Sequence, residues 1–430
     1  MLSVSCLLCG SLKRLTYCLV RATVRPHRPA RRSLEAAVPC IHVPHRWCAV
    51  VVACTAALAC ACEPIADPQD YDREPAPIFK RSTLVTPVAV SAPARLKVVA
   101  WNIKYGAGRI PFWFDCWGDR SQMSRAEVDA NMAKLYAAIG ELDPDVLIAE
   151  EIEVNSRRSA YFDMVKGILE NTNLNYATFA STWNSKYIAS EGVGRIHLGN
   201  AIFSKHKITK AERIRQVDRT DQDALTSMFY LKRALGRAEI EIKTGTKVAI
   251  WAVHSEAYDN DGTKKKQIEH IDELLKKEPL PFMVGGDFNE LPPIAVRKHG
   301  FMDEREKAVC SADFAQPPYT PEIMQRFYDN YVAAIALDRY GKSELEQKRF
   351  FTHSVLGPDE VNDKGEKGFW NRTLDYLFAS KGTSWVIGST DVAQQKGQKI
   401  GGDNGIGPVL TTDPVRLSDH APVVGTWEVP

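Results

Sequence analysis

Cysteine is scarce in most of this 430-residue sequence, because eight of its ten cysteines lie within the first 62 residues. Only Cys116 and Cys310 follow, so the rest of the chain has no CxxC pair. This distribution excludes a domain built on a disulfide framework, and it excludes a zinc site of the CxxC type in that part of the chain. The two remaining thiols could either form one bridge or stay free.

Long hydrophobic runs are also missing. The run over residues 47–61 is too short for a comfortable transmembrane helix. It follows Arg46 and ends in small residues, as a secretory signal does. The same stretch resembles a weak bacterial lipobox, so lipidation at Cys60 or Cys62 is a second reading and an uncleaved anchor a third. We therefore expect residues 1–62 to be an export signal region, and the product to be periplasmic, extracellular or lipid-anchored to the membrane.

The sequence has no basic excess once this region is set aside. Of 55 basic and 53 acidic residues, eight and one lie within the first 62, which leaves 47 against 52 and a formal charge of −5. A protein that binds long nucleic acid usually carries a basic face, so the balance argues against such a role without excluding a local patch. The Arg-rich residues 1–45 are long for the charged part of a signal, so translation could start further downstream.

Residues 63–95 contain six prolines and are expected to form an extended tether, with the folded domain over residues 96–430. In that domain, apolar runs alternate with amphipathic helical patterns, which predicts an α/β class with substantial sheet. Strands are predicted over residues 96–103, 145–150, 200–204, 247–253, 281–285, 373–378 and 422–427. Helices are predicted after the capping box at Ser124, around Ile268 to Leu275, and from Pro321 to about Asp338.

Polar side chains recur where the predicted strands end, namely Asn102, Glu150, Glu151, His254, Asp287, Asn289, Asp375, Asp419 and His420. Carboxylates gathered at one edge of a sheet repel one another unless a cation neutralises them, and oxygen ligands suit Mg²⁺ or Mn²⁺ rather than zinc. A histidine paired with an acid can take a proton from water. Each residue alone also has a structural explanation, such as a simple turn at residues 285–289. Their order along the chain favours an active site.

The succession of motifs resembles the endonuclease/exonuclease/phosphatase superfamily of DNase I-like metal-dependent phosphohydrolases. The matching residues are Trp101-Asn102, Glu151, His254, Gly286-Asp287-Phe288-Asn289, Asp375-Tyr376 and Ser418-Asp419-His420. The resemblance covers about residues 96–430. It implies a four-layer α/β/β/α sandwich of two packed mixed sheets flanked by helices, with Mg²⁺ or Mn²⁺ as the cofactor.

The resemblance also implies a role for each matched residue. Glu151 corresponds to the principal metal ligand, with Asn102 and Asp419 beside it. The remaining matches are catalytic: His420 as the base, Asp375 as the residue that orients it, Asp287 and Asn289 at the nucleophile and phosphate, and His254 at the scissile phosphate.

Two positions depart from the family pattern. Glu150 stands where a Gln is usual, so either Glu150 or Glu151 could take the metal, and Glu151 is the aligned choice. Arg372 lies three residues before Asp375 instead of two, which leaves its expected phosphate contact open.

The function expected from these observations is hydrolysis of a phosphoester, in a lipid headgroup, a sugar phosphate or a small phosphodiester, by a His-activated water. A secreted or periplasmic DNA or RNA endonuclease of the same superfamily is the alternative, and an inactive binding module is a third reading. Aromatic residues gather at residues 110–118 and 219–233, where they could stack on bases, bind sugar rings, rest on a membrane or pack against the sandwich. The only membrane association that we expect is through the N-terminus, by a lipid or a signal anchor. We expect no obligate protein partner.

Overall fold

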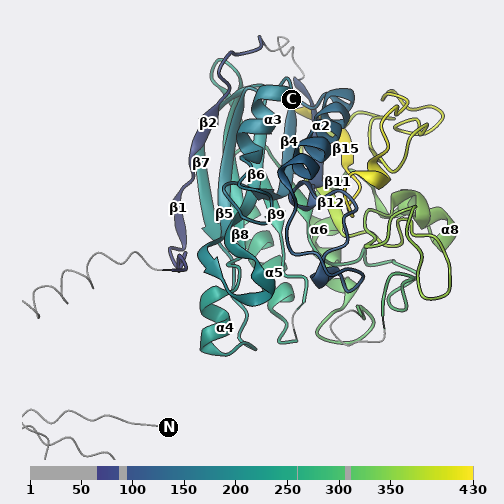
Figure 1. Cartoon of the computed structure of the whole chain (residues 1–430). Helices are drawn as coiled ribbons and strands as arrows, with labels where there is room; N and C mark the ends of the chain where they lie inside the picture. Colours follow the sequence, from purple (N-terminus) through teal and green to yellow (C-terminus); the bar gives the residue numbers. More distant parts are fainter. Residues whose placement is uncertain (1–64, 87–93, 259, 306–310, 430) are drawn as a thin grey trace, which may run out of the picture. The chain divides into compact units, whose positions relative to one another are not determined.

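The computed structural model describes residues 65–86, 94–258, 260–305 and 311–429. Their strands form two sheets with helices on the outer sides (Figure 1). The predicted export region, residues 1–62, lies outside the described residues and stays a prediction.

Among the described residues, eight strands build the first sheet, in the order β13-β15-β3-β4-β6-β5-β2 with β14 beside β15. They are β2 (Ile78–Lys80), β3 (Ala94–Asn102), β4 (Val146–Glu153), β5 (Tyr176–Ile188), β6 (Gly194–Ser204), β13 (Ser384–Trp385), β14 (Asp391–Val392) and β15 (Val423–Val429). β3 and β4 are parallel and the other pairs are antiparallel, so the sheet is mixed.

In the same part of the chain, seven strands build the second sheet, in the order β1-β7-β8-β9-β10-β12-β11. They are β1 (Arg73–Pro75), β7 (Lys207–Arg215), β8 (Ala234–Lys243), β9 (Thr246–His254), β10 (Phe282–Asp287), β11 (Val332–Ala333) and β12 (Asp375–Ala379). Only β9 and β10 are parallel in this sheet.

The described helices are α2 (Arg125–Leu142), α3 (Met164–Asn171), α4 (Ala224–Phe229), α5 (Thr263–Leu275), α6 (Gln325–Asn330), α7 (Leu337–Tyr340) and α8 (Glu344–Gln347). Short 3₁₀ turns lie at Lys104–Gly106, Trp113–Asp115, Ser190–Gly192, Pro321–Met324, Lys348–Phe350 and Pro414–Arg416. The predicted capping box begins α2, where the Ser124 hydroxyl accepts from the Glu127 N–H and the Glu127 carboxylate accepts from the Ser124 N–H.

Three apolar clusters define the layers. The largest lies between the sheets and joins residues such as Ile148 of β4 to Ile250 of β9. A second packs α2 and α3 against the outer face of the first sheet, and a third packs α5 and α6 against the second sheet. This is the predicted four-layer sandwich of two mixed sheets flanked by helices.

Two sequence expectations need correction. Residues 63–95 are not only a tether, because β1 pairs with β7 in one sheet and β2 pairs with β5 in the other. The folded domain therefore begins well before Leu96. The helix predicted from Pro321 to about Asp338 ends at Asn330, because Val332 and Ala333 leave it to pair with β12 as an edge strand.

No helix in the described part of the chain is both long and apolar enough to cross a membrane. Cys116 forms a disulfide, whereas Cys310 lies outside the described residues.

Candidate active site

Three of the predicted catalytic residues lie side by side across neighbouring strands of the second sheet. Asp287 ends β10, opposite His254 at the end of β9 and opposite Asp375 at the start of β12. The His254 Nε2 lies 3.5 Å from the Asp287 Oδ2. Parallel pairing of β9 with β10 and antiparallel pairing of β10 with β12 thus bring all three polar side chains to one edge.

His420 comes from the first sheet, just before β15, and meets this edge. Its Nδ1 lies 2.9 and 3.1 Å from the two Asp375 carboxylate oxygens, and its Nε2 lies 3.7 Å from the Asp287 Oδ2. The backbone around it is fixed, since the Trp101 indole N–H donates to the His420 carbonyl at 2.9 Å and the His420 N–H donates to the Ser418 hydroxyl at 3.2 Å. The site is therefore assembled from the facing edges of both sheets.

The charges of this group are coupled. Burial lowers the pKa of His420, but the carboxylates of Asp375 and Asp287 outweigh it and raise the pKa to about 10. Burial raises the pKa of Asp287 to about 7, with the His420 cation opposing the rise and Asp375 adding to it. Burial lowers the pKa of His254 well below its ordinary value, helped by the positive charges of Arg233 and His420. His254 is thus a neutral imidazole beside a cationic one.

A β-bulge in β4 distinguishes the two adjacent glutamates. The β4–β6 register shifts between Ala149 and Ile152, so Glu150 and Glu151 together oppose the single residue Asn200 of β6, and Glu151 adopts a φ of 57°. Bulges of this kind redirect side chains near active sites. Glu151 lines the central cavity. Glu150 points into the interior, where neither carboxyl oxygen has a hydrogen-bond partner.

Gly286 makes room for this buried carboxyl. A Cβ at Gly286 would lie 2.4 Å from the Glu150 Oε1 and 2.2 Å from the Val253 carbonyl oxygen, and its φ is 125°. Burial raises the pKa of Glu150 well above its ordinary value, followed by the negative charges of Asp375 and Asp287. Its surroundings beneath the site thus favour the protonated form of Glu150.

The two asparagines act as hydrogen-bond donors to carboxylates. The Asn102 Nδ2 donates to the Glu151 Oε1 at 3.2 Å and to the Asp287 Oδ2 at 3.3 Å, while its Oδ1 accepts from the Lys104 N–H at 3.0 Å. The Asn289 Nδ2 donates to the Asp287 Oδ2 at 3.2 Å and to the Ser255 carbonyl at 3.0 Å. Asn102 thus links the Glu151 side of the site to the Asp287 side.

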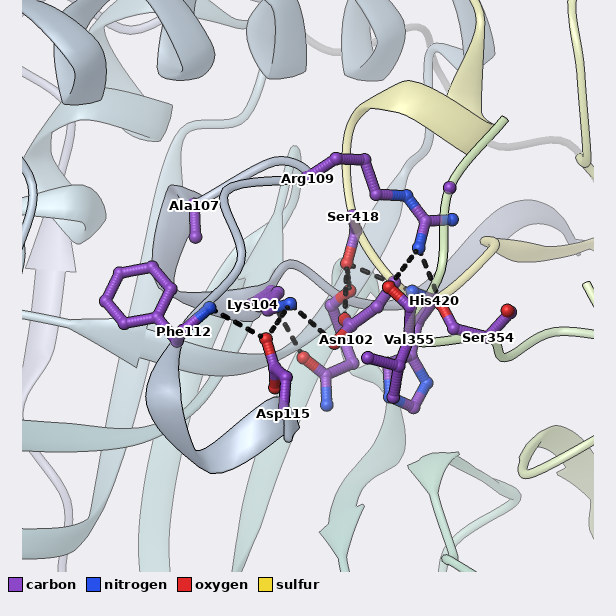
Figure 2. Close-up of polar contacts among 12 residues, drawn as sticks. Asn102, Lys104, Ala107, Arg109, Phe112, Asp115, Ser354, Val355, Ser418 and His420 are labelled. Carbon is purple, nitrogen blue, oxygen red and sulfur yellow. Dashed lines mark hydrogen bonds and ion pairs between the residues drawn. The ribbon is translucent and has the colours of Figure 1, made fainter. Parts of the chain in front are cut away.

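Lys104 is a buried lysine that the sequence motifs did not predict, and it lies beside the predicted Asp419. Figure 2 shows the Lys104 ammonium directed at Asp115, with an Nζ–Oδ2 distance of 2.6 Å. The same Nζ lies 3.2 Å from the Asp419 Oδ2. Burial lowers the pKa of Lys104, yet Asp115 and Asp419 reverse that effect and raise it overall. Lys104 lies two residues after the predicted Asn102, and this closeness could have pointed to it. Its partner Asp115, however, belongs to a separate insertion.

A cavity of about 260 Å³ opens onto these groups. Its lining includes the predicted His254, Asp287, Asn289, Glu151, Asp419 and His420. Asn102 and Asp375 stand behind this lining, where they hold Glu151 and His420. The structure therefore brings all eight predicted site residues into one cluster.

His353 also lines the cavity, although no sequence motif pointed to it. Its ring lies 4.5 Å from the His420 ring, and burial keeps its pKa well below the ordinary value, with Arg372 and His420 adding to the effect.

Arg109 secures the loop that follows His353. It donates from Nη1 to the carbonyls of Ser354, at 2.5 Å, and Val355, at 3.3 Å (Figure 2).

Arg372, whose phosphate contact was open, is held elsewhere. Its Nη1 and Nη2 lie 2.8 and 3.3 Å from the Asp303 carboxylate oxygens, and its guanidinium lies over Phe301. Arg233 lines the cavity in its place, beside His254 and paired with Glu256 at 3.5 Å. Arg233 is the cation better placed to meet a phosphate.

The acidic groups on the Glu151 side fit a divalent cation. Burial raises the pKa of Glu151 and the negative charge of Asp419 raises it further, so the Lys104 cation beside Asp419 does not fully compensate the two acids. Oxygen donors of this kind suit Mg²⁺ or Mn²⁺. Asp287, Asp375 and His420 also lie close enough to hold a metal. However, the Asp375 oxygens and the His420 Nδ1 already bind each other.

The sequence matches the model of the Endonuclease/Exonuclease/phosphatase family over residues 99–420, and the chain belongs to this family. Members of the family are phosphoester hydrolases that generally use divalent metals. The comparison with curated proteins gave no match.

Solved structures resemble the chain at low sequence identity. An endonuclease/exonuclease/phosphatase from Beutenbergia cavernae is 16% identical, with a TM-score of 0.45, and the match covers 78% of this chain and 72% of that one. A mannosyl-6-phosphatase from Bacteroides thetaiotaomicron is 13% identical, with a TM-score of 0.42 and coverage of 77% and 99%. The human Nocturnin catalytic domain is 16% identical, with a TM-score of 0.40 and coverage of 82% and 97%.

Proposed function

We propose that the chain is a Mg²⁺- or Mn²⁺-dependent phosphoester hydrolase that acts on a small phosphoester through a water activated by His420. The observation that carries this proposal is the Asp375–His420 pair, whose Nε2 lines the cavity 3.7 Å from Asp287. An imidazole held at Nδ1 by a carboxylate is oriented for proton transfer at Nε2.

The other residues of the site have complementary roles in this proposal. Asp287, held by Asn289, accepts a hydrogen bond from the attacking water and aims it at phosphorus. His254 is neutral, so its Nε2 can donate one hydrogen bond to a phosphoryl oxygen while Arg233 supplies positive charge behind it. Such preorganised donors stabilise charge that develops on the phosphoryl oxygens.

Glu151 and Asp419 would hold the metal, positioned by Asn102 and Lys104 respectively. The chemistry that a divalent cation would supply there is polarisation of a phosphoryl oxygen and compensation of the charge on the leaving group. The predicted ligation by the Asn102 oxygen would require its amide to turn, because the Nδ2 now faces Glu151 and Asp287. Positive charge held there would disfavour the cationic form of His420, and would so lower the pKa of its imidazole toward the value that a base needs.

The nuclease alternative is less well supported. The cations that line the cavity are already paired with carboxylates, namely Lys104 with Asp115, Arg158 with Glu153, and Arg233 with Glu256. A polyanion is bound through many cations that are free to neutralise its phosphates. The pairing favours a ligand with a single phosphate group.

The test is hydrolysis of bis(p-nitrophenyl) phosphate, p-nitrophenyl phosphate and plasmid DNA, with Mg²⁺, with Mn²⁺ and with EDTA. We expect metal-dependent cleavage of at least one small ester and none of the plasmid. Plasmid nicking that disappears in His420→Ala would establish the nuclease instead. Silence on all three substrates, with bound metal, would favour a binding role.

We also infer export of the chain, as its N-terminal sequence predicts. The Cys116 disulfide supports this inference, because disulfides persist in oxidising compartments. N-terminal sequencing of the mature product should show cleavage near residue 62, or a lipidated Cys60 or Cys62. An intact residue 1 on a cytosolic product would overturn the inference.

A further inference from the structure

The two aromatic stretches of the sequence line the same cavity from different elements. Trp113 and Phe114 come from the insertion over residues 110–118, and Tyr230 follows α4 in the second stretch. Trp183 of β5, which neither stretch contains, joins Tyr230 in the lining. These four rings share the cavity with His254 and His420. Residues far apart in the sequence thus build aromatic walls beside the catalytic groups.

The first wall is preorganised and still exposed. Phe114 stacks on Phe112 with ring centroids 5.6 Å apart, and the Arg158 guanidinium lies 5.7 Å from its ring. Asp115, the next residue, is fixed by Lys104. Nevertheless, 39% of the Trp113 surface and 36% of the Phe114 surface remain exposed. Packing within the insertion therefore holds these rings without covering them.

The second wall is fixed in the same way. A shift of register between Ser181 and Trp183 marks an irregularity in the β5–β6 ladder at this ring. The Trp183 indole N–H donates to the Phe229 carbonyl at 2.7 Å. The Tyr230 hydroxyl donates to the Glu256 Oε1 at 2.8 Å, and the Arg219 guanidinium lies 5.4 Å from the Tyr230 ring. Polar contacts hold both rings at their edges, and Trp183 also packs against an apolar cluster that includes Ile196 and Leu198. The part of each ring that lines the cavity is left for a ligand.

We propose that these walls bind a flat ring carried by the phosphoester, while its phosphate lies at His254 and His420. The position of the phosphate rests on the proposed function. The ligand class is a phosphoester with one aromatic ring system, either an aryl ester or a mononucleotide, because every planar ring offers a face for stacking. The cavity volume of about 260 Å³ lies just below the range typical of pockets for drug-sized ligands, and it suits one phosphate and one ring system.

Two inert probes isolate the contribution of the ring. Phenylphosphonate and methylphosphonate carry the same charged group and differ in the ring, and neither can be hydrolysed as an ester. We expect isothermal titration calorimetry on the full chain, in the presence of Mg²⁺, to show that phenylphosphonate binds about tenfold more tightly than methylphosphonate. The preference should shrink to less than about threefold in Trp113→Ala and in Trp183→Ala, since each removes the largest ring of one wall.

Tyr187→Ala is the matched control. Tyr187 is an aromatic residue of the same strand as Trp183, but it is 58% exposed and does not line the cavity. This variant should keep the full preference. Equal affinities for the two phosphonates in the unaltered chain, or a full preference in both tryptophan variants, would overturn the proposal.

The same titration separates this proposal from the proposed function, because binding needs no turnover. A preference for phenylphosphonate in a chain that hydrolyses no ester would leave the ring site standing and remove the hydrolase. The phosphonate analogue of adenosine 5′-monophosphate, which has a carbon in place of the ester oxygen and cannot be hydrolysed there, distinguishes the two ligand sources. Tighter binding than phenylphosphonate assigns a mononucleotide, and weaker binding assigns an aryl ester.

Discussion

The site residues at the strand ends and those in the loops are held in place by different kinds of contact. His254, Asp287 and Asp375 sit at the ends of paired strands, where the ladder fixes their spacing. Trp113 and Tyr230 stand on an insertion and after a short helix, and they are fixed by side-chain contacts instead. The proposed catalytic residues His254, Asp287 and Asp375 are thus placed by the sheet. Three of the four rings of the proposed ligand site, by contrast, stand on segments between strands.

The largest expected difference between the two regions is in turnover. Asp287→Ala should lower kcat by about 10³-fold or more, because it removes the group that aims the water. Trp113→Ala should lower kcat by less than about tenfold, because it acts on binding of the ring. Steady-state kinetics on bis(p-nitrophenyl) phosphate, with thermal unfolding as a check of the fold, compares them. A smaller loss in Asp287→Ala than in Trp113→Ala would reverse the assignment of the two regions.

Glycine substitutions test how tightly the strand ends are packed. Gly286→Ala should lower the free energy of unfolding by about 3 kcal/mol, because its Cβ meets the Val253 carbonyl and Glu150 at a left-handed φ. Gly140→Ala is the control, since nothing lies within 4 Å of its Cβ in α2. It should be neutral or stabilise by up to about 1 kcal/mol. Urea unfolding measures both, and equal effects would show that the β10 end is not tightly packed.

The two adjacent glutamates offer a sharper contrast within one strand. Glu151→Gln should weaken Mn²⁺ binding by about tenfold or more, because it removes a carboxylate of the cavity. Glu150→Gln should leave Mn²⁺ affinity within about twofold, since Glu150 is a neutral acid in the interior. Titration calorimetry with Mn²⁺ tests this without turnover. Loss of affinity in Asp287→Asn but not in Glu151→Gln would move the metal to the Asp287, Asp375 and His420 group.

The smallest expected effect concerns a histidine outside the site. Burial and the charge of Arg195 lower the pKa of His197 to about 4. The unfolded chain then binds more protons than the folded chain between pH 6.5 and 4, so this group costs stability as the pH falls through that window. His197→Gln should reduce the acid-induced loss of unfolding free energy by about 1 kcal/mol. Urea unfolding at pH 7 and pH 5.5 checks it, and an unchanged loss would show that other groups carry the pH dependence.

The strand ends were also the part of the molecule that sequence reasoning could predict. β4 and β10 are apolar runs, α2 carries a capping box, and the acids that follow the strands form short motifs. β7 was missed because the charged residues Glu212 and Arg213 interrupt the apolar pattern of a strand. They can be buried because Glu212 forms an ion pair with Arg237, and Arg213 forms one with Glu74.

The loop-borne features depend on contacts between distant segments, which no local pattern encodes. Lys104 needs Asp115, and His353 reaches His420 from a stretch without regular structure. The bulge that separates Glu150 from Glu151 depends on pairing with β6, so the sequence left their roles open. Recognition of the family supplied the roles of the matched residues but nothing about the aromatic walls.

The most direct test of the central claim is the kcat for bis(p-nitrophenyl) phosphate, at saturating Mg²⁺, of the unaltered chain and of His420→Asn. The asparagine cannot take up a proton, although it can occupy the same space beside Asp375. A fall of about 10³-fold or more, with an unchanged melting temperature and Mn²⁺ affinity, is the predicted result. A rate within about threefold of the unaltered chain would contradict the account, because His420 would then not be the base.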